Sequence, residues 1–165
     1  ALNFSDFRVI NGGQQLELGD LLVEVVTVPH DAAEPVQFVF TDTRSGRRLG
    51  VLTDSGHISP YMLQRYDRLD GLLLEFNYDQ DMLSRGSYPP MLKRRIAGNH
   101  GHLSNQQSLQ LLQEIDTSRL DCLIAAHISE NNNSADIVAD LLKRLDLHCA
   151  PVLACQQNGF DWIQV

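Results

Sequence analysis

Three runs of β-prone apolar residues in this chain each lead into a histidine or an aspartate. The first run leads into His30, the second into Asp54 and the third into His127. Because a sheet fixes its own backbone, a side chain just beyond a strand end is held firmly while it projects into a cleft. Imidazole and carboxylate groups suit zinc or manganese, and a carboxylate can bridge two metals. The pattern therefore predicts a metal site at one edge of a β-sheet.

Each of these residues also has a structural interpretation. A histidine after a strand is typical of hydrogen-bonded structure that has no ligand role. Asp54 precedes Ser55 and Gly56, so it is equally suited to forming a turn or to capping the helix expected from Ser59. The spacing alone leaves both interpretations open.

The chain has 165 residues, 43% of them hydrophobic and 21% charged, which indicates one globular domain over residues 1–165. We expect no membrane segment and no secretory signal, since the sequence has no long apolar run and no basic amino-terminal region. The three cysteines lack CxxC spacing. Cys122 and Cys155 are expected to be buried free thiols, which favours a reducing cytoplasm.

The formal net charge of −8 argues against a protein that coats nucleic acid by neutralising phosphates. It does not exclude a nuclease, because bound metal ions supply local positive charge. Lys93, Arg94 and Arg95 form one compact basic cluster, which is interpreted either as a set of substrate phosphate contacts or as a solvated helix face.

The order of predicted elements indicates an α/β fold. The first third alternates strands and turns and is predicted to form antiparallel β structure, whereas the later part alternates strands and helices. Helices are expected at 59–68, 89–96, 104–115 and 135–145, and later strands at 71–76, 121–126, 151–155 and 160–165.

From about Leu21 onward the chain resembles the metallo-β-lactamase superfamily, and within it the YycJ (WalJ) branch, which is similar to ribonuclease Z and to phosphonate-pathway phosphodiesterases of that fold. The resemblance implies an αββα sandwich, of which this chain would be the C-terminal portion. The strings that carry it are Thr53–His57, Leu74–Asp79, Tyr88–Pro90, Leu92–Ile96, Gly101–Asn105 and Ala126–Asn132.

The resemblance also implies a role for each matching residue. His30, Asp54 and His127 would be metal ligands, with Asp54 bridging two divalent ions, zinc or manganese. His102 would be a catalytic general acid for the leaving oxygen or a phosphate contact; the alternative is a residue at a helix start. The residues expected in the second shell or along the cleft are His57, Glu75, Asn77, Ser104 and Asn105.

The superfamily signature His-x-His-x-Asp-His occurs nowhere in this sequence. Three ligands cannot complete two metal sites, so we expect an upstream N-terminal half of the same domain to complete them, and the isolated chain to be inactive. For the intact protein the resemblance implies a dinuclear metal-activated hydroxide that cleaves phosphodiesters, with nucleic acid as the substrate and a 5′-to-3′ DNA exonuclease as the leading model. The alternatives are hydrolysis of a thioester or lactam, and a non-catalytic fragment.

Half of such a sandwich would expose an apolar sheet face, so the chain alone is expected to aggregate or to form a homo-oligomer. Candidates for the exposed face are Leu22, Val26, Val39, Val51 and Leu74.

Overall fold

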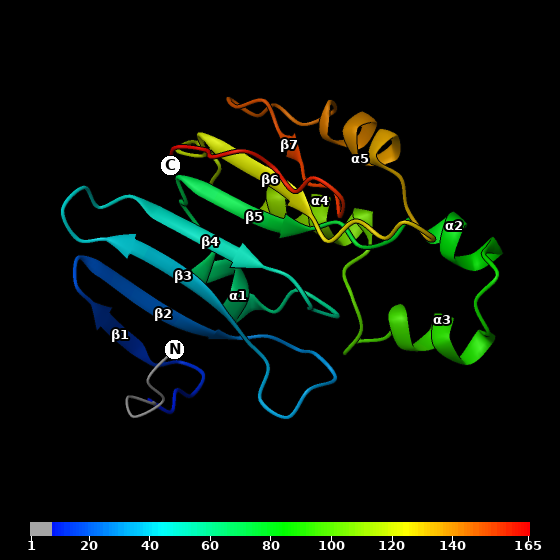
Figure 1. Ribbon diagram of the computed structural model, residues 1–165, viewed down its shortest axis with the longest axis horizontal. Helices are drawn as coiled ribbons and strands as arrows, with labels where there is room; N and C mark the ends of the chain where they lie inside the picture. Colours follow the sequence, from blue (N-terminus) through cyan, green and yellow to red (C-terminus); the bar gives the residue numbers. More distant parts are fainter. Residues whose placement is uncertain (1–7) are drawn as a thin grey trace.

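One mixed sheet runs through the protein, and its strands lie side by side in the order in which they occur in the sequence (Figure 1). The structure is a computed structural model that describes residues 8–165. Strands β1 to β4 are antiparallel, and β4 to β7 are parallel. The strands are β1 (Gln15–Leu18), β2 (Leu21–Thr27), β3 (Val36–Asp42), β4 (Arg48–Leu52), β5 (Gly71–Glu75), β6 (Cys122–Ala126) and β7 (Val152–Leu153).

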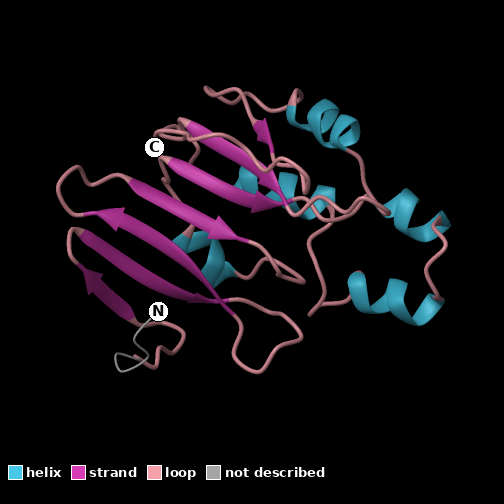
Figure 2. Cartoon of the chain, in the orientation of Figure 1, coloured by secondary structure: helices cyan, strands magenta, loops and turns pink. Residues whose placement is uncertain are grey.

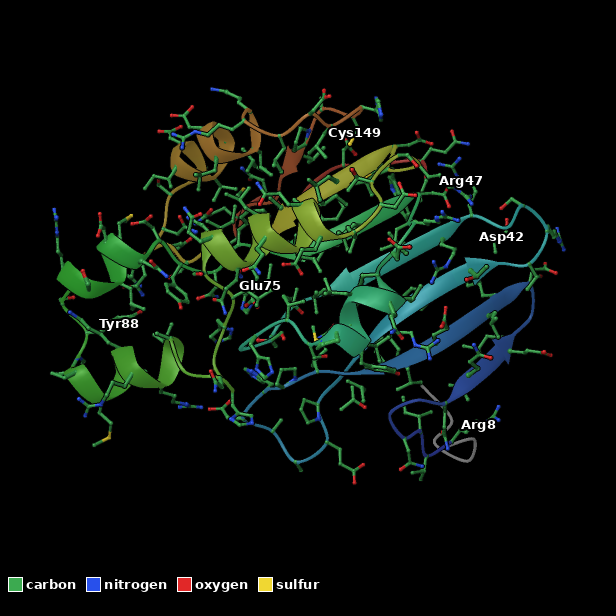
Figure 3. All side chains as sticks on the ribbon, turned by 180° about the vertical axis from the view of Figure 1, so that it is seen from behind. Arg8, Asp42, Arg47, Glu75, Tyr88 and Cys149 are labelled. Carbon is green, nitrogen blue, oxygen red and sulfur yellow. The ribbon has the colours of Figure 1, made fainter. Side chains whose placement is uncertain are left out.

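Three helices cover one face of this sheet, and two stand beside its edge (Figures 1 and 2). Seen from behind, α1, α4 and α5 lie in front of the strands (Figure 3). The side chains of Ser59 and Ser104 cap two of these helices, as serine before a helix predicts. The helices are α1 (Pro60–Arg65), α2 (Gln80–Arg85), α3 (Pro90–Ile96), α4 (Asn105–Glu114) and α5 (Ala135–Leu142).

Three sequence predictions differ from this structure. Residues 160–165 form no strand; their apolar side chains Ile163 and Val165 instead pack on the helix-free face of the sheet. Helix α2 was not predicted, because its six residues are too few to show an apolar period. Cys122 is buried as predicted, but Cys155 is exposed because it lies beyond the short β7.

The side of the sheet opposite the helices is apolar as well. Five apolar residues lie in register across this face, each opposite the next on the neighbouring strand: Val25, Phe38, Val51, Leu73 and Ile124. We call this set of five residues the open-face row. The carboxyl-terminal segment lies over the row at β4 to β6. At the other end of the row, Val25 is buried in a second cluster with Leu16 and Val23, against which Phe38 packs. A sheet that is apolar on both faces is typical of an inner layer of a larger domain.

The sequence prediction for this exposed face was largely wrong. Val26, Val39 and Leu74 belong to the core beneath the helices. Leu22 shares their side, since it alternates with Glu24, whose carboxylate pairs with Arg65 of α1. Of the candidates, Val51 lies in the open-face row. The error arises because apolar residues occupy both faces, so composition cannot distinguish neighbouring positions.

Strands β2, β4, β5 and β6 all point the same way, so their carboxyl ends meet at one edge of the sheet. In open α/β sheets this edge is where ligands bind. His30, Asp54, Glu75 and His127 all lie at or just beyond these strand ends. No helix in the described part of the chain is both long and apolar enough to cross a bilayer.

Adjacent residues of β3 provide a test of the two faces. We expect Val39→Ser to lower the free energy of unfolding by roughly 2–4 kcal/mol, because it leaves a cavity and buries a hydroxyl. Phe38→Ser should cost less and should reduce self-association of the 165-residue chain. Urea denaturation and light scattering measure the two effects. Equal destabilisation with unchanged association would contradict the assignment of faces.

Candidate metal centre

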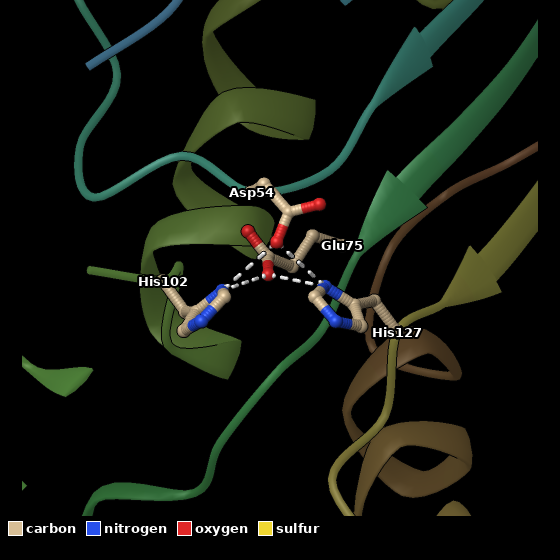
Figure 4. Close-up of side chains that lie close together, drawn as sticks. All are labelled: Asp54, Glu75, His102 and His127. Carbon is tan, nitrogen blue, oxygen red and sulfur yellow. Dashed lines mark hydrogen bonds and ion pairs between the residues drawn. The ribbon is translucent and has the colours of Figure 1, made fainter. Parts of the chain in front are cut away.

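Four side chains from four separate segments converge at the strand edge (Figure 4). Asp54, Glu75, His102 and His127 offer ligand atoms that lie within 4.8 Å of one another. The Oδ1 atom of Asp54 lies 3.6 Å from Nδ1 of His102 and 3.8 Å from Nδ1 of His127. His30 joins them, since its Nε2 lies 3.8 Å from the same oxygen. One carboxylate oxygen is therefore surrounded by three imidazoles.

Glu75 ends β5 and is the buried member of the group. Its side chain has no exposed surface. Both of its carboxylate oxygens nevertheless accept hydrogen bonds from neighbouring groups. One oxygen, Oε1, accepts hydrogen bonds from Nδ1 of His102 and of His127, both at 2.8 Å. The other, Oε2, accepts from the backbone N–H groups of Ser55 and Leu103 at 3.2 Å. Burial raises the pKa of Glu75, but the bonds from the two histidines outweigh it and hold the pKa below its ordinary value.

All three histidines of the site are held at the same ring atom. Nδ1 of His30 donates to the carbonyl of Gly101 at 2.9 Å, while Nδ1 of His102 and of His127 donate to Glu75. A carbonyl or an ionised carboxylate can only accept, so Nδ1 carries the proton in each ring and Nε2 of a neutral ring keeps its lone pair. This is the usual arrangement around metal-binding histidines, whose second nitrogen is fixed by an acceptor.

The spacing and chemistry of these groups fit a divalent metal ion. Two ligands of one tetrahedral zinc, at bond lengths of about 2.0–2.2 Å, are separated by roughly 3.4 Å. The 3.8 Å between Oδ1 of Asp54 and Nε2 of His30 is only slightly longer. The contacts of Asp54 with His102 and His127 end at Nδ1, which is bonded to Glu75, so Nε2 is the atom those two rings leave free. The 2.8 Å contacts of Glu75 are hydrogen bonds, so this carboxylate orients the two histidines. His30, Asp54 and His127 are the residues able to hold an ion, and His102 lies beside them.

Backbone geometry brings two of these side chains into place. Asp54 and His127 adopt left-handed conformations, with φ of 52° and 55°. Such values are uncommon outside glycine and cluster at functional sites. His102 sits where the chain leaves α3, in a turn tight enough that a Cβ at Gly101 would collide with the carbonyl oxygen of Ile96. A glycine is therefore required just before His102.

The remaining expected site residues surround the group in different ways. His57 lies outside it and donates from Nδ1 to the carbonyl of Asn99 at 3.0 Å. Asn77 donates to the carbonyl of His127 at 3.2 Å and so supports that turn. Ser104 is a helix cap, and Asn105 is buried in a reciprocal amide pair with Asn133. The last two therefore act in the packing behind the site.

The basic cluster divides into three different environments. Nζ of Lys93 donates to the carbonyl of Ser84 at 2.7 Å and joins α3 to α2. Nε of Arg95 lies 2.5 Å from Oδ2 of Asp31, the residue after His30. Arg94 is exposed, and within residues 8–165 it has no ion pair or side-chain hydrogen bond. Of the three, Arg94 is the side chain free to meet a phosphate.

Sequence reasoning left one feature of this site open and missed another. It expected Glu75 in the second shell or along the cleft, and the structure shows its carboxylate between two histidines. A carboxylate that ends an apolar strand was the available signal, because buried acids are rare without partners. The pairing of Asp31 with Arg95 had no sequence signal, since 64 residues separate them.

Comparison with known proteins gives one family. Residues 4–128 match the model of the Beta-lactamase superfamily domain. Exodeoxyribonuclease YycJ of Bacillus anthracis is 32% identical over 129 residues, which make up 78% of this chain and 48% of that protein. Exodeoxyribonuclease WalJ of Streptococcus pneumoniae is 31% identical over 133 residues, or 81% of this chain and 49% of WalJ. The chain thus spans about half the length of these relatives.

Solved structures share the fold at low sequence identity. The metallo-beta-lactamase fold protein YhfI of Bacillus subtilis gives a TM-score of 0.65 at 17% identity, covering 93% of this chain and 54% of that one. Zn(2+)-bound PqqB of Methylobacterium extorquens gives 0.60 at 18% identity, covering 94% and 55%. These similarities agree with an αββα metallo-β-lactamase sandwich.

The contact between Glu75 and His127 generates a pH prediction. The hydrogen bond to Glu75, opposed by burial, raises the pKa of His127 above its ordinary 6.5. In the metal-free chain this pair stabilises the fold fully below that ordinary pKa, and the contribution is lost as pH rises through the raised pKa. An NMR titration should show the pKa of His127 fall in Glu75→Gln. The exposed His148 is the internal reference, and an unchanged His127 would contradict the assignment.

Proposed function

The chain belongs to the β-lactamase superfamily, and from this membership we propose that it forms the carboxyl-terminal half of a divalent-metal hydrolase that cleaves phosphodiester bonds in DNA. The observation that carries the proposal is the convergence of His30, Asp54, His102 and His127 at one strand edge. Each of the three histidines is fixed at Nδ1 and so presents Nε2. The imidazoles of His30 and His127 and the carboxylate of Asp54 are suited to zinc or manganese, which leaves Nε2 of His102 for another role.

When bound, a pair of divalent ions would lower the pKa of water and neutralise charge on the phosphate. The residues of this chain have simpler tasks. Asp54, His30 and His127 would hold the ions. Glu75 keeps His102 and His127 at fixed angles to Asp54. Preset geometry of this kind reduces the reorganisation needed during reaction.

His102 is assigned the proton transfer to the leaving oxygen. Its Nδ1 is bonded to Glu75, so its Nε2 is the atom that donates when the ring is protonated. The carboxylate of Glu75 holds the orientation of that ring. In this assignment His102 acts on the substrate, whereas Glu75 acts through His102.

The ligands that this chain contributes are too few for two ions, so we assign the remainder to an upstream half. The apolar open-face row is a surface suited to packing against a second sheet. The names of the relatives support DNA as the substrate. So does the charge on α2 and α3, where Arg85, Lys93, Arg94 and Arg95 stand against a single acid, Asp81. Basic groups beside a site attract phosphates even in an acidic protein.

Asp54→Ala tests the metal centre in the full-length protein. Because Asp54 faces all three imidazoles, its loss should reduce the zinc or manganese bound in equilibrium dialysis. Asp81→Ala removes an exposed carboxylate from α2 and serves as the matched control. Metal content that stays at the wild-type level in Asp54→Ala would sink the proposed centre.

His102→Ala separates proton transfer from the other contributions. We expect cleavage of 5′-labelled DNA to slow by roughly 100-fold or more. The leaving group of DNA is an alkoxide, which needs the proton that His102 would supply. Bis(p-nitrophenyl) phosphate should be affected much less, since nitrophenolate leaves without one. An equal loss on both substrates would contradict the role of His102. A full-length protein that hydrolyses thioesters and leaves DNA intact would overturn the nuclease assignment.

A further inference from the structure

A closed ring of contacts joins α3 to the His30 loop. Nε of Arg95 lies 2.5 Å from Oδ2 of Asp31, and Oδ1 of the same carboxylate lies 3.5 Å from Nε2 of His30. His30 then donates from Nδ1 to the carbonyl of Gly101, which follows α3 by a few residues. The loop between β2 and β3 therefore contacts the segment from Arg95 to Gly101 at two points, through the side chains of Asp31 and His30.

The rest of this loop provides little support for His30. Residues 31–34 form an exposed bend before β3 begins. Ahead of the histidine, the carbonyl of Pro29 accepts a hydrogen bond from the N–H of Gly56 at 2.7 Å. Beyond it, the N–H of Val28 donates to the carbonyl of Pro35 at 3.2 Å and closes the base of the loop. Within the bend itself, Asp31 pairs with Arg95 and so connects it to α3. The orientation of His30 thus depends on its own Nδ1 bond and on its neighbour in the sequence.

Asp31 also needs a cationic partner for an electrostatic reason. The proton of a neutral His30 ring is on Nδ1, so Nε2, Oδ1 of Asp31 and Oδ1 of Asp54 are three electron-pair donors facing one another. No hydrogen bond can form among them in that state. An Asp31 carboxylate released from Arg95 would be free to turn, either toward a metal on Nε2 or away into solvent.

We propose that Asp31 and Arg95 are a positioning pair that sets His30 for metal binding. The inference rests on the proposed metal centre. Arg95 is one of three adjacent basic residues, but its guanidinium is used inside the protein. Its side chain is 68% exposed, and ion pairs of that kind add little to stability. The pair therefore acts on the geometry of the site and leaves the stability of the fold nearly unchanged.

The test compares neighbouring arginines in the full-length protein. Arg94→Ala and Arg95→Ala remove the same charge from adjacent positions, and only the second breaks the ring of contacts. Zn²⁺ affinity, measured by competition with a chromophoric chelator, should fall about 10-fold in Arg95→Ala, as for other groups that orient a ligand. It should stay at the wild-type value in Arg94→Ala. Arg95→Lys, which keeps a cation beside Asp31, should recover most of the loss.

Asp31→Asn completes the comparison. It should match Arg95→Ala in Zn²⁺ affinity, and the double variant should be no weaker than either single one, because both changes break one contact. The visible absorption of bound Co²⁺ reports whether the geometry of the metal ligands changes together with the Zn²⁺ affinity. Wild-type affinity in Arg95→Ala, or equal losses in Arg94→Ala and Arg95→Ala, would overturn the positioning role and leave the metal centre standing. Absence of Zn²⁺ binding in the wild-type protein would instead overturn the proposed function.

Discussion

The buried carboxylate of Glu75 is the interaction on which the rest of the site depends. An ionised carboxylate without exposed surface is costly unless each oxygen finds donors. Here the donors come from three other segments: the turn after β4 supplies Ser55, the turn before α4 supplies His102 and Leu103, and the end of β6 supplies His127. Loops that are distant in the sequence are thereby fixed to one strand end, and the imidazoles are oriented as a consequence.

This arrangement also explains why strained backbone persists at the strand edge. Asp54 and His127 hold positive φ values immediately beyond their strands, and such conformations last only where the surroundings determine them. The parallel register of β4, β5 and β6 fixes where each strand ends. Glu75 and the amide of Asn77 then hold the following turns. Rigidity of the sheet is thus transmitted to the side chains of the candidate metal centre.

The two faces of the sheet differ in what covers them. Helices α1, α4 and α5 cover one face, while the open-face row presents apolar side chains on the other. Ile163 and Val165 of segment 160–165 lie over part of that row. The strand edge that carries the histidines borders both faces. The chain spans about half the length of its curated relatives, so an apolar face without a helical layer is consistent with a further layer in the whole protein.

The sequence by itself determined the α/β class and the helix starts at Ser59 and Ser104. It also identified His30, Asp54 and His127 as candidate metal ligands. Both results were possible because helix capping and position at a strand end are local patterns. The family resemblance likewise rested on short strings. Only the tertiary structure decided that Glu75 binds two histidines and that segment 160–165 covers the sheet. It alone distinguished Arg95 from Arg94. These outcomes depend on contacts between residues up to 64 positions apart in the sequence. They also depend on which of the two apolar faces of the sheet a segment packs against. Local spacing in the sequence encodes neither.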